Sequence, residues 1–207
     1  MLIDRLIGKQ LGHPSGVIGN VVAATMNRRN AYINKATLEL LQIKAGDCVL
    51  EIGFGGGAAL HEMTRLAPDG LVAGVEISDA MLKRGRGKFS GSISEGKVEF
   101  RKGSASEIPY QDSFFDKACA VNSIYFWPDP MAGLKEVNRV LRNGGVFVLS
   151  VAPEEQLEKY PPASHGFAIY PDAQLESFLN TAGFVGVRME RREHRPFAAV
   201  LFLGNKT

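Results

Sequence analysis

The stretch C-V-L-E-I-G-F-G-G-G, Cys48 to Gly57, decides the fold of this 207-residue chain. A short apolar run, typical of a buried strand, passes directly into a loop with four glycines among the five residues 53–57. Glycine allows positive φ angles and lets a ligand approach the backbone closely, at an entropic cost. A turn that only joins a strand to a helix rarely needs so many glycines. The loop is therefore predicted to bind a ligand.

Strands and helices alternate after this loop. Apolar runs predict strands at residues 48–52, 71–77, 98–101, 116–122 and 146–151, and helical patterns occupy residues 58–66, 79–89, 131–141 and 172–182. This α/β alternation predicts a doubly wound, Rossmann-like, mostly parallel sheet with helices on both faces and ligands at the carboxyl ends of the strands. Two final apolar runs, residues 184–191 and 197–203, lie so close in the chain that they must pair as an antiparallel hairpin.

The segment before the sheet is predicted to form a separate helical cap. We divide the chain into this cap, residues 1–45, and a ligand-binding domain, residues 46–207. Glycines and a proline make the part from Gly8 to Gly19 loop-like, whereas apolar residues recur at helical spacing from Val21 to Ile43. Within the domain, Asn143-Gly144-Gly145 is expected to end a helix, and residues 153–171 are expected to form a long, lid-like loop.

Composition excludes several classes of protein. A net charge of +2 gives no reason to expect nucleic-acid binding. The two cysteines form no C-x-x-C or Cys/His cluster, so we expect no metal and a reducing compartment. The sequence contains no signal peptide and no apolar stretch long enough to span a membrane, so we expect a cytoplasmic protein. The oligomeric state is open.

Residues around the glycine loop narrow the choice of ligand class. Gly53, Gly55 and Ala58 fit the pattern G-x-G-x-x-A, and Glu76 follows at the distance of an acid that binds ribose hydroxyls. Both nicotinamide dinucleotides and S-adenosylmethionine contain such a ribose. Glu51 favours the second, because a carboxylate sits badly beside a pyrophosphate but well near the ammonium group of a methionine.

Further motifs resemble those of class I S-adenosylmethionine-dependent methyltransferases. The small type-11 branch, which includes quinone-biosynthesis methyltransferases, is most similar. The matching stretches, which together span about residues 45–204, are V-L-E-I-G-F-G-G-G (49–57), G-V-E-I-S (74–78), G-S-A-S-E-I-P-Y-Q-D-S-F-F-D (103–116), L-K-E-V-N-R-V-L-R-N-G-G (134–145) and A-G-F-V-G-V (182–187). The resemblance implies a seven-stranded sheet whose last strand is antiparallel.

The resemblance also implies a cofactor site. Its expected members are Glu51, Gly53, Phe54, Gly55, Gly57, Glu76, Ile77, Met81, Ser104, Ala105 and Asn122. Ile77 and Met81 would flank the adenine, and Asn122 would face the sulfonium. Many relatives have Asp where this chain has Ser104, and a hydroxyl accepts a weaker hydrogen bond from the adenine amino group than a carboxylate does. His13 and the segment from Met26 to Tyr32 would close over the cofactor, with Asn30 and Tyr32 as contacts.

Methyl transfer from a sulfonium mostly requires alignment and exclusion of water. Aromatic residues 125–127 are candidate pocket walls, and Tyr125 and His165 are candidate catalytic residues, the histidine as a general base. The run N-S-I-Y-F-W lacks the N/D-P-P-Y/F stretch of relatives that methylate amino groups, which favours a small-molecule acceptor. Three alternatives remain: methylation of RNA or protein, a non-catalytic binding protein on the same fold, and, more distantly, a nicotinamide oxidoreductase.

Overall fold

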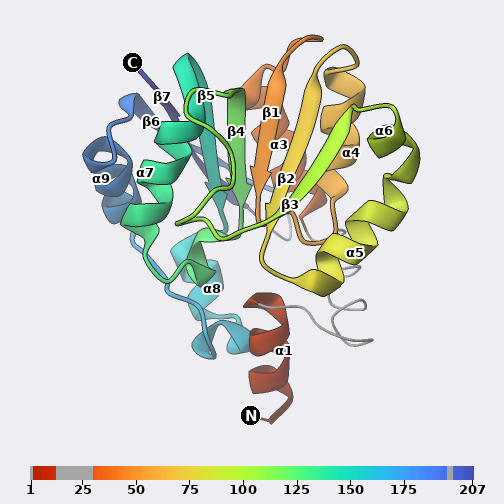
Figure 1. Cartoon of the computed structure of the whole chain (residues 1–207). Helices are drawn as coiled ribbons and strands as arrows, with labels where there is room; N and C mark the ends of the chain where they lie inside the picture. Colours follow the sequence, from red (N-terminus) through yellow and green to blue (C-terminus); the bar gives the residue numbers. More distant parts are fainter. Residues whose placement is uncertain (1, 13–29, 195–197) are drawn as a thin grey trace.

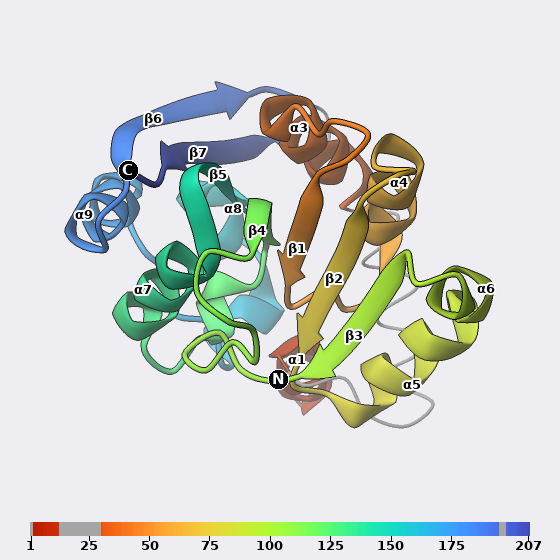
Figure 2. The ribbon, with the colours of Figure 1, turned by 45° about the horizontal axis from the view of Figure 1, so that its top comes forward.

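The computed structural model describes residues 2–12, 30–194 and 198–207 (Figure 1). These residues form a seven-stranded sheet with the order β3-β2-β1-β4-β5-β7-β6 (Figure 2). Its strands are β1 Cys48–Ile52, β2 Leu71–Glu76, β3 Val98–Lys102, β4 Phe115–Val121, β5 Leu141–Val151, β6 Val185–Arg192 and β7 Ala199–Asn205. Neighbouring strands from β3 to β5 are parallel, and β7 is antiparallel to both β5 and β6. The predicted fold, including the terminal hairpin, is confirmed.

Helices lie between the strands along the chain and also precede the first strand. They are α1 Leu2–Gly12, α3 Ala31–Leu41, α4 Ala58–Leu66, α5 Asp79–Lys88, α6 Ser90–Ser94, α7 Pro130–Val140, α8 Glu154–Glu158 and α9 Asp172–Thr181, with 3-10 turns η1 Ile124–Phe126 and η2 Pro161–Ser164. The Ser78 hydroxyl accepts a hydrogen bond from the Met81 N–H and begins α5 as predicted. No helix of the described residues is long and apolar enough to cross a membrane.

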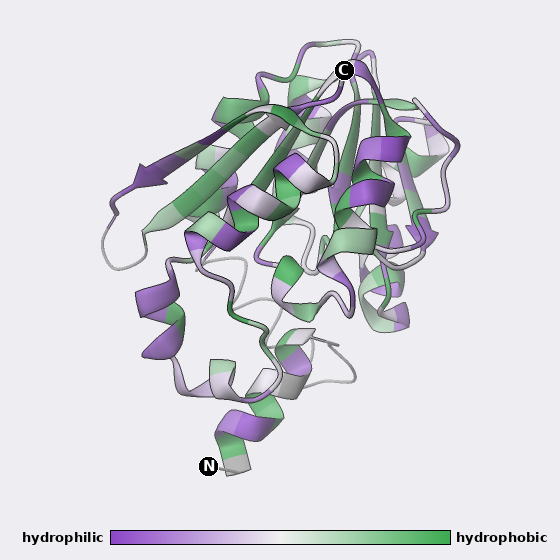
Figure 3. Ribbon diagram, turned by 90° about the vertical axis from the view of Figure 1, so that its left-hand side faces the viewer, coloured by the Kyte–Doolittle hydropathy of each residue, from purple (hydrophilic) through white to green (hydrophobic). Residues whose placement is uncertain are grey.

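Two hydrophobic cores lie on opposite faces of the sheet, because successive side chains of a strand point to opposite faces. On β1, Leu50 joins the core that also contains Leu134 of α7 and Leu179 of α9. Val49 joins the other core, which contains Leu41 of α3 and residues of α4. Figure 3 shows hydrophobic colouring along the central strands and mixed colouring on the covering helices, as expected for helices with one buried face.

Helix α3 belongs to the packed structure of the sheet. It contacts β4, β5, β7 and α4. The Thr37 and Ser150 hydroxyls, both fully buried, lie 2.6 Å apart and form a hydrogen bond between α3 and β5. Helix α1 lies elsewhere, beside η2 at the end of the molecule that carries the amino terminus (Figure 1). The two described helices of the first 45 residues therefore contact different parts of the protein.

The prediction of a loop from Gly8 onward is wrong for residues 8–12, which belong to α1. The glycines of α1 allow this helix to pack closely against neighbouring segments. A Cβ atom on Gly8 would lie 2.6 Å from the Pro162 carbonyl oxygen, and one on Gly12 would lie 2.8 Å from the Phe126 ring. The helix predicted from Val21 begins only at residue 31 among the described residues, and His13 and residues 26–29 lie outside them.

Two other local predictions need correction. Asn143-Gly144-Gly145 does not end a helix but lies within β5, because Leu141 already pairs with Phe115 and the Gly144 N–H donates to the Lys206 carbonyl. The segment 153–171 is not a continuous loop, since it contains α8 and η2. The short helix α6 was not predicted.

Candidate active site

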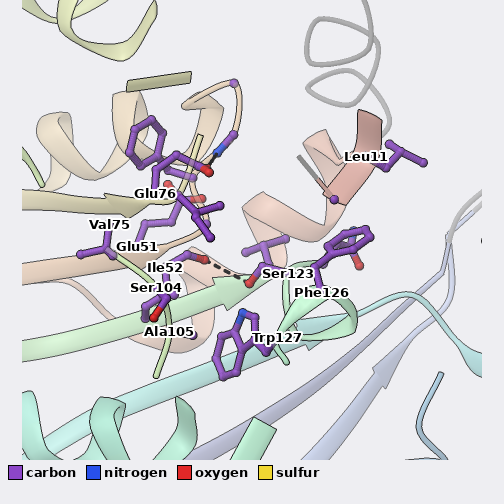
Figure 4. A pocket seen from close by; sticks show the side chains of 18 of the residues that line it. Leu11, Glu51, Ile52, Val75, Glu76, Ser104, Ala105, Ser123, Phe126 and Trp127 are labelled. Atoms are coloured by element: carbon purple, nitrogen blue, oxygen red, sulfur yellow. Dashed lines mark hydrogen bonds between the residues drawn. The ribbon is translucent and has the colours of Figure 1, made fainter. Parts of the chain in front are cut away.

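A cavity of about 640 Å³ lies at the carboxyl ends of β1, β2 and β4 (Figure 4). Its walls come from the glycine loop after β1, the end of β2, the turn after β3 and the residues that follow β4. Helix α1 contributes Arg5, Gly8 and Leu11. This is the edge at which parallel α/β sheets bind ligands, so the cavity lies where the sequence predicts a site.

The glycine loop needs its glycines for two different reasons. Gly53, Gly55 and Gly57 have φ angles of +73°, +47° and +65°, which L-residues rarely adopt. A Cβ atom on Gly53 would also lie 2.8 Å from the Cβ of Ser123, so the first glycine permits close approach of the loop after β4. A Cβ atom on Gly55 would meet nothing within 4 Å, so this glycine leaves open space beside the cavity.

Backbone donors hold the Glu76 carboxylate in place. One oxygen accepts a hydrogen bond from the Gly55 N–H at 3.1 Å and the other accepts one from the Ser78 N–H at 2.9 Å. A carboxylate has about four acceptor positions. Glu76 therefore retains acceptor capacity toward the cavity, which is what binding two ribose hydroxyls requires.

Glu51 is a buried carboxyl group with one oxygen that lacks a hydrogen-bond partner. The residue is only 5% exposed, it lines the cavity, and its Oε2 atom has no hydrogen-bond partner. Burial, together with repulsion from Glu76, raises the pKa of Glu51 to about 8, although a hydrogen bond from the Leu60 backbone opposes this shift. A buried, unpaired carboxylate is expensive unless a cation joins it. The ammonium group of a bound methionine moiety fits this requirement.

Only some of the residues predicted to contact adenine line the cavity. Ile77 is 49% exposed and lines the cavity, as do Ser104 and Ala105. Met81 is fully buried and lies outside the lining. The exposed Ile77 is an apolar surface available to a planar ring, whereas Met81 has no such surface.

Two predicted loop residues contribute differently from expectation. Phe54 lines the cavity, but its ring packs 4.7 Å from the Phe100 ring, in space that Gly74 and Gly85 leave free. Gly57 is the N-cap of α4 and lies outside the lining. Both residues shape the loop through packing and backbone conformation.

Asn122 is held by several hydrogen bonds at the end of β4. Its φ angle of +51° is unusual for a residue with a side chain. The side-chain amide donates to Asn30 Oδ1 at 3.1 Å, and its Oδ1 accepts from the Ala152 N–H at 3.0 Å and the Tyr125 hydroxyl at 3.1 Å. Such strained residues cluster at functional sites. Asn122 lines the cavity, and Asn30 does so as well.

Tyr125 and His165 lie in different surroundings. The Tyr125 hydroxyl accepts a 2.8 Å hydrogen bond from the Ala152 N–H, and burial raises the pKa of the phenol, so the group is neutral. Tyr125 does not line the first cavity. His165, which ends η2, does line it. Tyr32 stacks on His194 at 4.0 Å and is absent from the lining.

A second cavity of about 330 Å³ adjoins the first. Leu11, Asn30, Asn122 and Phe126 line both cavities. Tyr125 lines the second cavity only, and Trp127 lines the first only, so the predicted aromatic walls are divided between them. The two cavities therefore meet at the end of β4.

Several lining residues were not predicted from the sequence. Ser123 lines the first cavity and donates a hydrogen bond from its hydroxyl to the Ile52 carbonyl at 3.1 Å (Figure 4). Arg5 and Leu11 reach the cavity from α1. The position of Ser123 directly after a strand was an available signal. For residues of α1 no local signal existed, because their placement depends on packing against η2.

Comparison with known proteins agrees with this geometry. Residues 50–149 match a family model described as a methyltransferase domain. The chain is 28% identical over 190 residues to the uncharacterized methyltransferase YdaC of Bacillus subtilis, an alignment that covers 92% of this chain and 98% of that protein. It is 32% identical over 182 residues to the ubiquinone/menaquinone biosynthesis C-methyltransferase UbiE of Teredinibacter turnerae, covering 74% of this chain and 73% of the relative.

The fold has matches among solved structures. A SAM-dependent methyltransferase from Aquifex aeolicus superimposes with a TM-score of 0.70 at 20% identity, covering 84% of this chain and 89% of that one. At this identity the match establishes the fold, and the sequence relatives establish the family. The chain belongs to the class I S-adenosylmethionine-dependent methyltransferases, and S-adenosylmethionine is its cofactor.

Proposed function

We propose that this methyltransferase transfers a methyl group directly to a small-molecule acceptor bound in the second cavity. The single observation that carries the proposal is the contact between the two cavities at Asn122 and Phe126. A volume of about 330 Å³ is at the lower end of the range for small-molecule sites. The relative from Teredinibacter turnerae, named for ubiquinone and menaquinone biosynthesis, is consistent with a small acceptor.

The residues of the first cavity would hold the cofactor. Bound S-adenosylmethionine supplies a methyl group activated by its sulfonium. Glu51 would pair with the ammonium group, and Glu76 would accept hydrogen bonds from the ribose hydroxyls. Ile77 and Ser104 would contact the adenine. These contacts orient the ligand, which is most of what an in-line displacement asks of an enzyme.

Asn122 and Phe126 would act where the two ligands meet. Asn122 cannot turn freely, because its amide is bonded to both Asn30 and Ala152. Tyr125 supports the same amide, and we assign it a positioning role. The aromatic ring of Phe126 excludes water and favours a nearby sulfonium. Whether His165 acts as a general base depends on the acceptor, since only an acceptor that arrives protonated needs one.

The proposal can be tested with purified protein. S-adenosylhomocysteine is titrated calorimetrically, and methyl-labelled S-adenosylmethionine is then incubated with the protein and a cell extract that is separated into small-molecule, RNA and protein fractions. We expect label in the small-molecule fraction with the wild type and none with Glu76→Ala. Label found only in RNA or protein would refute the small-molecule acceptor. Absence of S-adenosylhomocysteine binding would contradict the site itself.

A further inference from the structure

We propose that the acceptor is a small, largely apolar acid that binds in its ionised form, with its negative charge facing Lys159 in the second cavity. This inference rests on the proposed function, because it concerns the acceptor of the same reaction. It adds the chemical class of that acceptor, which the family relationship does not provide.

Aromatic and aliphatic side chains form most of the second cavity. The Phe167 ring stacks on the Tyr125 ring at 5.4 Å with an interplanar angle of 19°, and it meets the Phe126 ring edge-on at 4.6 Å. Ile33 from α3 and Leu157 from α8 complete the apolar walls. Such walls stabilise an aromatic or aliphatic body through burial and ring contacts.

Two polar side chains of this cavity already have hydrogen-bond partners within the protein. The Tyr125 hydroxyl and the Asn122 amide bind one another and the Ala152 backbone. Lys159, directly after α8, is the one charged residue among the described residues that line the cavity. No ion pair joins its ammonium group to any described residue. The nearby Glu155 forms its ion pair with Arg191, and the more distant charge of Lys159 adds a smaller contribution to lowering the pKa of Glu155.

Neither the described lining of the second cavity nor the undescribed residues of the chain contain a carboxylate side chain. No Asp or Glu occurs among the described residues of its lining. Residues 1, 13–29 and 195–197, which the structure does not describe, contain no Asp or Glu in the sequence. No part of this chain outside the described residues can therefore add a negative charge. Lys159 is itself exposed, so it attracts an anion only modestly, but no charge among the described lining residues attracts a cation.

The chemistry of the transfer agrees with an ionised acceptor. One oxygen of the acceptor anion faces Lys159 and the other donates a lone pair to the methyl carbon, and the methyl–sulfur bond breaks with its electron pair left on sulfur. Both products are neutral at the reacting atoms, and no proton has to be removed. A neutral alcohol or an ammonium group would need a base, and neither a carboxylate nor a histidine occurs among the described residues lining this cavity. An apolar cavity favours a reaction in which opposite charges disappear.

Naphthoate and naphthamide are suitable probes, since they share one ring system and differ in charge. Each is titrated calorimetrically into protein saturated with S-adenosylhomocysteine. Wild-type protein should bind naphthoate about three- to fivefold more tightly than naphthamide, a ratio in the upper part of the range for one exposed ionic contact. Lys159→Gln should abolish this preference without changing naphthamide or S-adenosylhomocysteine affinity, and Lys159→Arg should retain it. Lys135→Gln, at an exposed position of α7 outside both cavities, is the matched control.

Each other outcome decides against the inference or against its premise. Equal affinity of the two probes for the wild type overturns the anionic acceptor. So does an equal loss of both probes in Lys159→Gln, which would indicate a disturbed cavity. Binding of neither probe by protein that still binds S-adenosylhomocysteine also overturns it, while leaving the cofactor site intact. If S-adenosylhomocysteine itself does not bind, the proposed function fails instead.

Discussion

Replacement of Glu51 by glutamine tests the electrostatic basis of cofactor binding. With a pKa of about 8, the buried carboxyl group is about nine-tenths protonated at pH 7 in the free protein. Pairing with an ammonium group requires the ionised form. Cofactor binding at pH 7 should therefore release about 0.8 proton, and affinity should fall roughly 25-fold between pH 8 and pH 6, when the ligand amine, with a pKa near 8, is included. Above about pH 8 the ligand's own amine loses its charge, so affinity should be greatest near that pH.

Glu51→Gln keeps the size of the side chain and removes its charge. We expect the variant to bind S-adenosylhomocysteine at least about tenfold more weakly at pH 8 and to lose both the acid-side pH dependence and the proton release. Calorimetry in two buffers with different ionisation enthalpies measures that release. Glu176→Gln, on the exposed side of α9, is the control and should behave as the wild type. Wild-type binding without proton release at pH 7, or unchanged affinity in Glu51→Gln, would refute the reasoning.

Glu51→Gln should weaken cofactor binding but raise the stability of the ligand-free protein at pH 7. Because the pKa of Glu51 is raised from 4.5 to about 8 on folding, the native state binds more protons than the unfolded state in this window. Stability of the ligand-free protein is therefore lost as pH rises through the window, by up to about 3 kcal/mol between pH 4.5 and pH 7. Glu51→Gln should lack this loss and unfold at a higher temperature than the wild type at pH 7. The neighbouring Cys119 thiol does not add to the effect, since burial and Glu51 raise its pKa and keep it neutral.

Three further substitutions probe the remaining parts of the site. Gly55→Val should cost roughly 1–2 kcal/mol of stability through its φ of +47° and abolish S-adenosylhomocysteine binding, measured by thermal unfolding and calorimetry; retained binding would contradict the role of the loop. Tyr125→Phe should lower stability by about 1–3 kcal/mol, because Asn122 loses a hydrogen bond, while cofactor affinity changes less than threefold or so; a larger loss of affinity would mean direct contact. Ser104→Asp should tighten S-adenosylhomocysteine binding by about three- to tenfold, and weaker binding would show that the adenine edge lies elsewhere.

The sheet could be predicted because its signals are local. A strand buried on both faces reads as a continuous apolar run, and residues 48–52 form β1 as predicted. The Ser78 cap likewise begins α5 where expected. The hairpin could be predicted from the short connection between its two strands, since strands separated by only a few residues can pair only antiparallel. The position of Glu51 and Glu76 beside the cavity could be predicted too, because the topology of a parallel sheet fixes where the strand ends lie.

Features set by distant contacts could not be predicted in this way. Gly8 looks like a helix breaker in sequence, yet it is required where α1 approaches the Pro162 carbonyl. The Asn143-Gly144-Gly145 run resembles a helix stop, but β5 continues through it by pairing with the chain near residue 206. Lys159 carries no motif at all. Its relevance appears only in the folded protein, where it is the one charged residue among the described residues that line the second cavity.

Asn122 shows how the site depends on both kinds of information. The sequence places it at the end of the fourth predicted strand, but its side chain bonds to Asn30, 92 positions away, and to the backbone of Ala152. Its own N–H donates to the Ser150 carbonyl at 2.8 Å. These bonds hold a non-glycine residue at a φ of +51°, which would otherwise cost about 1–3 kcal/mol. Because Asn122 lines both cavities, that strained conformation keeps one amide at the boundary where, on our proposal, the methyl group and its acceptor meet.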